Sequence, residues 1–278
     1  MKPISSLFVA WHSELPSPRW GPVGRVDALP GTTRKSYRFC YTNGAKMIEG
    51  FRPFDGMVDL NAVYYSDEQF PMLVNRLLSK SRPEYGDFLR WNDFDPADPP
   101  APLVLLQRSE GIKKTDSIEV FPYPVPDNTG CYLNFFFVHG MRFQLGNPVA
   151  AETVSQLRVG DRLQFRCEPD NPVDPFAVAI DAGQTPIGYA PRYLAHDLTR
   201  LLRDCPAGSV NLFVQKVNSD APFQQRLLLR MHGCWPADFS HNRKEYRWPI
   251  SKTNESCCCA MPPGFREPTS TRKECVPT

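Results

Sequence analysis

Two short segments hold most of the side chains that suit a polar binding site. Residues Glu168 to Ile180 read EPDNPVDPFAVAI, and residues Ile187 to Arg192 read IGYAPR. The first segment sets Asn171 and Asp174 among prolines, and the second ends in an arginine. Charged groups and turn-forming residues thus fall between two apolar runs, and we expect the function of the chain to reside there.

The elements around these segments follow from local patterns. Asn and Asp side chains cap neighbouring backbone N–H groups in proline-rich turns, which fixes the turn before Ala177. The apolar run that ends at Ile180 predicts a buried strand. Pro191 is a favoured first residue of a helix, and Leu194 and Leu198 begin a leucine repeat at helical spacing that continues to Leu201.

The order of these motifs, together with two earlier ones, resembles the HIRAN domain. The earlier motifs are Gly140-Met141-Arg142-Phe143 and the turn Gly160-Asp161, and the similarity spans about residues 132–235. The resemblance implies a small OB-like β-barrel with one or two helices. In the best understood member of the family, the domain captures the free 3′ end of single-stranded DNA.

The resemblance also implies roles for individual residues. A DNA end requires an acceptor for its hydroxyl, a planar surface for its base and cations for its phosphates. The candidates are Asp174 as acceptor, Phe143 and Tyr189 as stacking surfaces, Arg142 and Arg192 on phosphates, and Asn171 on a phosphate or base edge.

Each role has a simpler alternative. Asp174 and Asn171 are also typical turn-capping residues. Phe143 is equally compatible with a core position in a strand, and the two arginines with solvated surface positions.

Two features predict a modest interaction. The positions of Val173 and Gln144 are aromatic in the end-binding relative, and each lost stacking contact removes about 1–3 kcal/mol per base. From Tyr132 to Trp235 the sequence has ten Lys and Arg against nine Asp and Glu. We therefore expect few phosphate contacts and a shallow dependence of binding on salt.

The first half of the chain predicts an α+β domain. Apolar runs predict strands at Leu7–Trp11, Pro22–Val26, Tyr37–Tyr41 and Ser117–Phe121. A helix is predicted from Ser66 or Asp67, with an apolar stripe formed by Phe70, Leu73, Val74, Leu77 and Leu78, and a second helix from Pro83 to Trp91.

This order of elements over about residues 5–122 resembles the N-terminal subdomain of HipA-type serine/threonine kinases. The parts of a kinase core are absent from the sequence. The resemblance therefore implies an alternative function, in which the chain binds and regulates a HipA-like kinase in the manner of an antitoxin.

Composition divides the chain into four parts. We predict an α+β domain at 1–122, a Pro-rich linker at 123–130, the HIRAN domain at 131–237 and a disordered tail at 238–278. No apolar run is long enough to cross a bilayer, and the first residues do not form an export signal, so we expect a cytoplasmic protein.

The sequence offers no catalytic or metal-binding motif. The patterns HExxH, GxSxG, GxxxxGK[ST] and CxxC are absent. Adjacent cysteines at 257–259 are not spaced as zinc ligands, and Cys131 and Cys234 are among five scattered cysteines predicted to be free thiols. We therefore expect a protein without catalytic activity, cofactor or metal.

Overall fold

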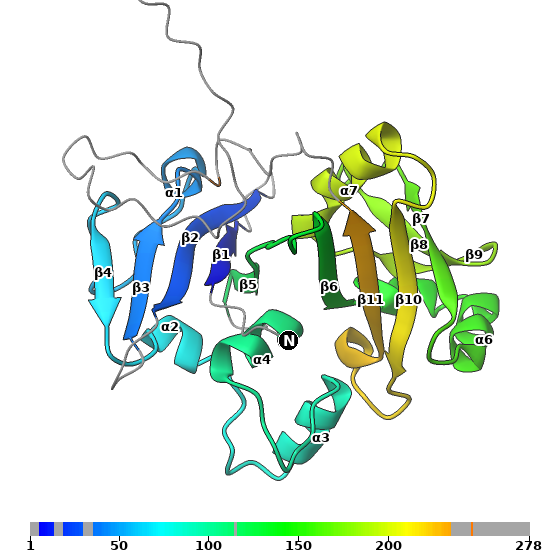
Figure 1. The fold of residues 1–278 in the computed structure, drawn as a ribbon, viewed down its shortest axis with the longest axis horizontal. Coiled ribbons are helices and arrows are strands. Elements are labelled where there is room, and N and C mark those ends of the chain that lie inside the picture. Colours follow the sequence, from blue (N-terminus) through cyan, green and yellow to red (C-terminus); the bar gives the residue numbers. More distant parts are fainter. Residues whose placement is uncertain (1–5, 14–18, 30–35, 114–115, 235–245, 247–278) are drawn as a thin grey trace, which may run out of the picture.

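Two antiparallel sheets lie side by side (Figure 1). The computed structural model describes residues 6–13, 19–29, 36–113, 116–234 and 246. The first sheet lies within residues 6–122 and the second within residues 131–234. The predicted tail falls outside the described residues apart from Tyr246.

The first sheet has five strands in the order β4-β3-β2-β1-β5. Their bounds are β1 Ser6–His12, β2 Trp20–Leu29, β3 Ser36–Tyr41, β4 Val63–Ser66 and β5 Ile118–Pro122. The four predicted strands are confirmed as β1, β2, β3 and β5, and β4 was not predicted. In β1, Leu7 and Val9 join one apolar cluster while Phe8 and Ala10 join another, so alternate residues of this strand are buried on opposite faces.

Among the described residues of this half of the chain there are four helices. They are α1 Gly44–Met47, α2 Pro71–Val74, α3 Tyr85–Trp91 and α4 Pro102–Ser109. The helix predicted from Pro83 is confirmed as α3. The helix predicted from Ser66 to Leu78 is wrong in extent, because Ser66 ends β4 and α2 has only four residues.

An inward-pointing arginine accounts for this short helix. Arg76 follows α2, and its Nη1 donates hydrogen bonds to the carbonyls of Gly111 and Ile118, each at 2.7 Å. The arginine is 7% exposed and its side chain also pairs with Asp116. A continued apolar stripe would have placed Val74 in the core, but Val74 is 48% exposed.

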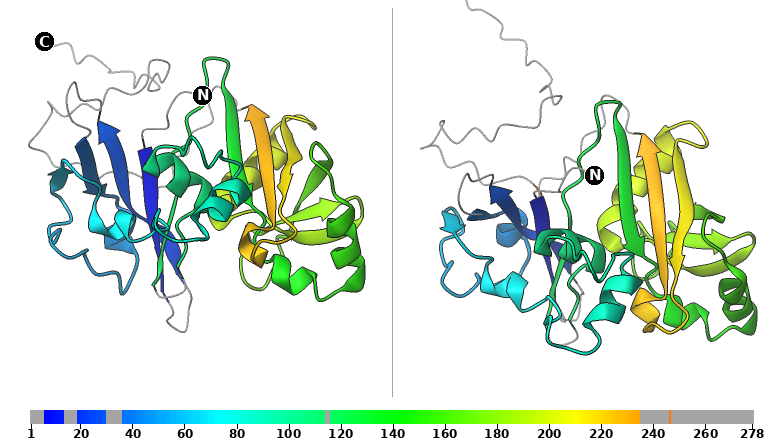
Figure 2. Two further views of the ribbon diagram at one scale, coloured as in Figure 1. Left: turned by 90° about the horizontal axis from the view of Figure 1, so that it is seen from below. Right: turned by 60° about the horizontal axis from the view of Figure 1, so that its bottom comes forward.

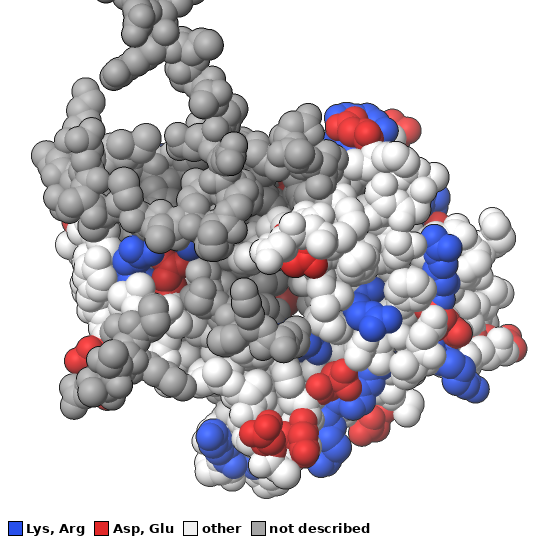
Figure 3. Space-filling view, viewed as in Figure 1, with Lys and Arg blue, Asp and Glu red and all other residues white. Residues whose placement is uncertain are grey.

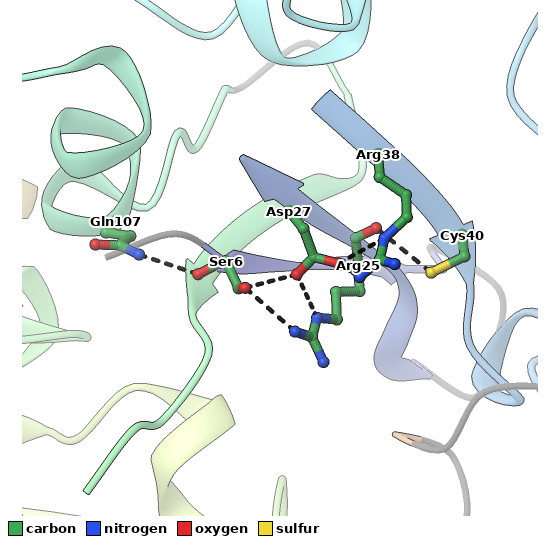
Figure 4. A network of polar contacts seen from close by, with 6 residues as sticks. All are labelled: Ser6, Arg25, Asp27, Arg38, Cys40 and Gln107. Carbon is green, nitrogen blue, oxygen red and sulfur yellow. Dashed lines mark hydrogen bonds and ion pairs between the residues drawn. The ribbon is translucent and has the colours of Figure 1, made fainter. Parts of the chain in front are cut away.

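A buried carboxylate joins the three central strands of the first sheet (Figure 4). Asp27 of β2 accepts hydrogen bonds from Ser6 Oγ at 2.6 Å, Arg25 Nε at 2.7 Å and Arg38 Nη2 at 2.8 Å. From α4, Gln107 Nε2 donates to the carbonyl of Ser6 at 3.0 Å. Because a buried carboxylate is stable only when charges and hydrogen bonds compensate it, Asp27 fixes the positions of these side chains relative to one another.

The second sheet has six strands in the order β6-β11-β10-β7-β8-β9. Their bounds are β6 Cys131–Phe137, β7 Arg162–Cys167, β8 Val178–Ala182, β9 Thr185–Tyr189, β10 Val210–Val217 and β11 Leu227–Cys234. Three α-helices and a 3₁₀ turn accompany them, where one or two helices were expected. They are α5 Met141–Gln144, α6 Pro148–Gln156, α7 Arg192–Asp204 and η1 Phe223–Gln225.

The sequence predicted a barrel, but the sheet does not close into a continuous ring of paired strands. The two ends of the sheet meet at an isolated bridge, in which the backbone of His139 exchanges hydrogen bonds with Tyr189 at 3.0 and 2.9 Å. The pairing ends there because Gly140 adopts a left-handed backbone (φ 65°) and turns the chain into α5. The close approach also requires Gly188, since a Cβ at that position would lie 2.6 Å from the carbonyl oxygen of His139.

The leucine repeat predicted after Pro191 is confirmed in α7. Leu194, Leu198 and Leu201 are all buried, and Pro191 stands immediately before the helix. The predicted strand ending at Ile180 is confirmed as β8.

One apolar core lies between the two sheets, and a second core lies on the other face of the first sheet. Phe8 and Phe121 of the first sheet belong to the same cluster as the buried residues of the second. The ring of Phe121 stacks on Tyr193 of α7 at 4.6 Å with an interplanar angle of 8°. Figure 2 shows β6, the edge strand of the second sheet, between β11 and the first sheet in both views.

Polar contacts reinforce this junction at its α3 and α4 side. The guanidinium of Arg108 in α4 lies 4.1 Å from the ring centroid of Phe135 in β6. Asn218 Nδ2 donates to the carbonyl of Trp91 at 2.9 Å, and Gln215 Nε2 donates to Asp93 Oδ2 at 2.8 Å. The sheets are therefore held together at several separate places.

Cysteine pairing differs from the expectation. Cys131 at the start of β6 and Cys234 at the end of β11 form a disulfide between directly paired positions, with Cα atoms 4.1 Å apart. The thiols of Cys40, Cys167 and Cys205 form no disulfide within the described residues, in agreement with the prediction. Sequence alone could not pair two cysteines that are 103 positions apart.

Among the described residues, no helix is both long and apolar enough to cross a membrane. The same part of the chain contains no group of three or more His, Cys, Asp or Glu side chains arranged to hold a metal ion. The cysteines at 257–259 lie outside it.

The shared core predicts a large stability loss on truncation of Phe121. We expect Phe121→Ala to lower the free energy of unfolding by about 3–5 kcal/mol, because the side chain is 2% exposed and contacts both halves. Urea unfolding followed by circular dichroism measures the change. The matched control is Phe143→Ala, a 73% exposed phenylalanine, for which a change within about 0.5 kcal/mol is expected. Equal effects at the two positions would contradict the shared core.

Candidate functional site

The turn that precedes β8 is fixed by the side chain of Asn171. Its Nδ2 donates to Glu168 Oε2 at 3.0 Å, and its Oδ1 accepts from the backbone N–H groups of Val173 and Asp174 at 3.0 and 3.2 Å. Asn171 therefore performs the backbone role that was its simpler alternative. Its remaining hydrogen-bonding capacity is small, and a direct ligand contact stays a prediction.

Asp174 combines a turn-capping role with an ion pair. Its Oδ1 accepts from the backbone N–H of Phe176 at 2.9 Å, as a capping aspartate does. Its Oδ2 accepts from Arg192 Nε at 3.0 Å. The turn and the first residue of α7 thus bring together two predicted site residues that are 18 positions apart.

These two residues line a surface groove, here called the end groove. Its volume is about 240 Å³, and its lining residues are Trp20, Asp174, Pro175, Phe176, Arg192 and His196. The Asp174 side chain is 18% exposed and the Arg192 side chain 39% exposed, so both are accessible to a ligand. The groove contains an acceptor, a cation and aromatic side chains.

Tyr189 lies beneath the turn, outside the lining of the groove. Its hydroxyl donates to Glu168 Oε2 at 3.1 Å, and Arg166 pairs with the other oxygen of Glu168 at 2.8 Å. Burial raises the pKa of Glu168, but hydrogen bonds from Asn171, Arg166 and Tyr189 outweigh this and lower it. Glu168 is therefore held ionised and anchors the turn from below, with Tyr189 as one of its supports.

Arg142 and Phe143 form a separate exposed pair. Both lie on α5, where the guanidinium carbon of Arg142 is 4.6 Å from the ring centroid of Phe143. The alternative of a core aromatic in a strand is wrong for Phe143, because the chain is helical there and the side chain is 73% exposed. Neither residue lines the end groove.

A cluster of ionisable groups lies at the junction of the sheets. His139 Nε2 is 2.7 Å from Glu110 Oε2, at the end of α4. Burial lowers the pKa of His139, but the carboxylates of Glu110 and Glu119 outweigh this and raise it to about 9. Burial, reinforced by Glu110, raises the pKa of Glu119 to about 7, while Arg192 acts in the opposite direction. Glu119 of this cluster thus interacts electrostatically with Arg192, which lines the end groove.

Sequence reasoning did not assign four of the six lining residues to a site: Trp20, Pro175, Phe176 and His196. Phe176 and His196 meet edge to face at 4.8 Å, and Phe176 is 41% exposed. Phe176 follows Asp174 by two positions, so an exposed aromatic beside the acceptor was a usable signal. Trp20 lies in the other half of the chain, and no local pattern could place it in this groove.

Comparison with known proteins identifies a domain family within the second half of the chain. Residues 132–231 match the HIRAN domain family. A solved protein from Lactobacillus plantarum has 22% sequence identity, a TM-score of 0.28, and alignment over 37% of this chain and 99% of that protein. The HIRAN domain of human HLTF has 14% identity, a TM-score of 0.26, and alignment over 37% of this chain and 73% of that chain. No curated protein matches the sequence.

The HIRAN match begins at residue 132 and leaves the first sheet unassigned. The resemblance of residues 5–122 to the N-terminal subdomain of HipA-type kinases is not supported by any of these comparisons.

The ion pair at the junction predicts a pH-dependent stability contribution. A histidine whose pKa is raised by folding stabilises the fold below its unfolded pKa of about 6.5, and this contribution is lost as the pH rises through about 9. We expect His139→Gln to reduce stability at pH 6 and to have a much smaller effect at pH 9.5. Chemical unfolding of both proteins across this range measures the difference.

The partner of the ion pair provides the control for this measurement. Glu110→Gln should abolish the same pH-dependent difference, because it removes the carboxylate closest to His139. A difference between wild type and His139→Gln that stays constant from pH 6 to 9.5 would contradict the assignment.

Proposed function

We propose that this chain is a non-catalytic binding protein whose HIRAN domain recognises single-stranded DNA at a free 3′ end. The HIRAN domain is known as a DNA-binding domain, and residues 132–231 match it. The observation that carries the finer proposal is the Asp174–Arg192 pair in the end groove. This pair offers an acceptor and a cation at the spacing of one ion pair.

The side chains of Asp174 and Arg192 match two polar groups of a terminal nucleotide, its 3′-hydroxyl and its phosphate. A carboxylate oxygen has more than one acceptor direction, so Asp174 Oδ2 accepts from the 3′-hydroxyl while it remains beside Arg192. The guanidinium of Arg192 uses Nε in the ion pair, and its terminal nitrogens then bind the phosphate that precedes the terminal sugar. A 3′-phosphate in place of the hydroxyl brings negative charge against Asp174 and is disfavoured.

The charge distribution supports a small footprint. On the part of the surface that Figure 3 describes, Lys and Arg side chains are interspersed with Asp and Glu and do not form one continuous basic patch. Proteins that coat long nucleic acids have a clear basic excess. A contact with one strand end needs only a few cations.

The exposed pair on α5 is a separate candidate contact. Phe143 and Arg142 present an aromatic face and a cation to solvent, the combination on which unpaired bases stack. Their effect on affinity is expected to depend on strand length, because they do not line the groove that holds the terminus.

Substitution of Asp174 tests the proposal directly. We expect Asp174→Ala to weaken binding of a short single strand with a 3′-hydroxyl by about 10- to 100-fold, because a hydrogen bond to a charged group contributes about 1.5–3 kcal/mol. Binding of the same strand with a 3′-phosphate should change little. Fluorescence anisotropy of labelled strands measures both affinities.

A second aspartate separates ligand binding from turn capping. Asp161 caps the backbone N–H of Arg158 at 2.7 Å in another turn of the domain and does not line the groove. Asp161→Ala should therefore leave affinity for the hydroxyl end unchanged. Equal affinity of wild type for hydroxyl and phosphate ends, or equal loss in the two variants, would refute end recognition through Asp174.

Few phosphate contacts predict a weak response to salt. A protein that binds two phosphates of a single strand should give a slope of about −1.4 for log affinity against log salt concentration, at about −0.7 per phosphate. We expect Arg192→Ala to make this slope shallower by about 0.7. Anisotropy titrations at several salt concentrations give the slopes.

Arg203 supplies the matched control for the salt experiment. It lies in the last turn of the same helix, pairs with the adjacent Asp204 at 2.6 Å and is 68% exposed. Arg203→Ala should leave the slope unchanged. A slope steeper than about −4 for wild type would indicate an extended phosphate-binding surface.

A further inference from the structure

The end groove takes one wall from outside the HIRAN domain. Asp174, Pro175, Phe176, Arg192 and His196 come from the second sheet and its helix, whereas Trp20 is the first residue of β2 in the first sheet. The region matched by the family begins at residue 132. The domain alone therefore lacks part of the groove that the whole chain presents.

The indole of Trp20 is held in place from two directions. Its ring stacks on Phe121 with centroids 5.8 Å apart and an interplanar angle of 28°. Its Nε1 donates a hydrogen bond to Glu119 Oε1 in β5. Phe121 in turn stacks on Tyr193, so the indole belongs to a continuous aromatic column that crosses the junction. An aromatic ring fixed in this way loses little conformational entropy when a ligand stacks on it.

The groove contains groups for two of the three parts of a terminal nucleotide before Trp20 is considered. Asp174 matches the hydroxyl and Arg192 matches the phosphate. The base requires a planar surface, which the turn does not supply at its tip, because Val173 is aliphatic there and 81% exposed. Phe176 is engaged edge to face with His196. Trp20 is the largest aromatic group in the lining, and indole presents a broad face for stacking.

We infer that Trp20 is the stacking surface for the terminal base, so that the first sheet completes the strand-end site of the HIRAN domain. This inference rests on the proposed function and names a specificity-determining residue for the same site. Asp174 and Arg192 position the sugar and its phosphate, and the base then lies against the indole. The first sheet thereby becomes part of the binding site and is more than a support for it.

A structural role alone would give a different result from stacking. Trp20→Leu keeps an apolar but smaller side chain and removes both the planar ring and the hydrogen bond to Glu119, whereas Trp20→Phe keeps a ring and removes only that hydrogen bond. A purely structural tryptophan would affect strands with and without a terminal base equally. A stacking tryptophan affects only a strand whose terminal nucleotide has a base.

The test compares two single strands of one sequence with a 3′-hydroxyl, one ending in adenosine and the other in an abasic nucleotide. With the full chain, we expect Trp20→Leu to weaken binding of the adenosine-ended strand about tenfold and to leave the abasic-ended strand within twofold of wild type. Trp20→Phe should recover most of the loss. Thermal unfolding of each variant confirms that it is folded at the temperature of the titration.

Trp91 provides a matched control. It is also a partly buried tryptophan at the junction of the sheets, and its Nε1 donates to Asp220 Oδ2 at 3.3 Å, but it does not line the groove. Trp91→Leu should leave both affinities unchanged. A strand with 2-aminopurine as its terminal base gives a second readout, since its emission should fall on binding to wild type and not on binding to Trp20→Leu.

The outcomes distinguish failure of the role assigned to Trp20 from failure of the proposed recognition of a 3′ end. If wild type prefers the hydroxyl end and Asp174→Ala removes this preference, but Trp20→Leu acts on neither strand or on both equally, only the role of Trp20 is overturned. If wild type does not distinguish the hydroxyl from the phosphate end, the proposed function fails and the inference fails with it. Selective loss for the adenosine-ended strand supports both.

Discussion

The stacking of Phe121 on Tyr193 is the contact on which the arrangement of the molecule depends. It joins the last strand of the first sheet to the first turn of α7, and both rings are buried. The same helix begins with Arg192, and the same column of rings continues to Trp20. The position of the end groove is therefore a consequence of how the two sheets meet.

Charged groups beside this column are balanced against one another. Glu110 and Glu119 lie in the first half of the chain and repel each other, whereas His139, in the second half, stabilises the charge of both carboxylates. Their mutual pairing makes the docked arrangement specific, because a rotation of one sheet against the other would separate His139 from Glu110. Apolar contact thus holds the sheets together while the ion pair fixes their register.

Local patterns in the sequence were sufficient for elements whose period is carried by their own residues. Four of the five strands of the first sheet and the leucine face of α7 were predicted because each is a short apolar or periodic run of its own residues. The helix after β4 was overestimated because Arg76 finds buried carbonyl partners that are more than 30 positions away. The open barrel and the disulfide likewise depend on long-range meetings that periodicity does not encode.

The candidate site likewise contains residues that a local motif identifies and residues that only long-range packing positions. The turn and the pairing of Asp174 with Arg192 lie within one family motif, so both residues were identified from sequence. The strand position considered as the alternative for Phe143 is wrong because the left-handed Gly140 that precedes α5 leaves no hydrophobic signature in the sequence. Trp20 reaches the groove only through the packing of one sheet on another.

The disulfide joins the two ends of residues 131–234, so this segment is attached to the rest of the chain like an inserted domain. Cys131 and Cys234 bracket the segment matched by the HIRAN family, so the chain enters and leaves that segment at one point. Beyond it, Tyr246 packs edge to face on Phe8 of β1 at 5.0 Å. The first sheet therefore receives contacts from residues on both sides of the second. While the bond is formed, residues 131–234 are a covalent ring, and a cut in any of its loops would leave both fragments attached to the first sheet.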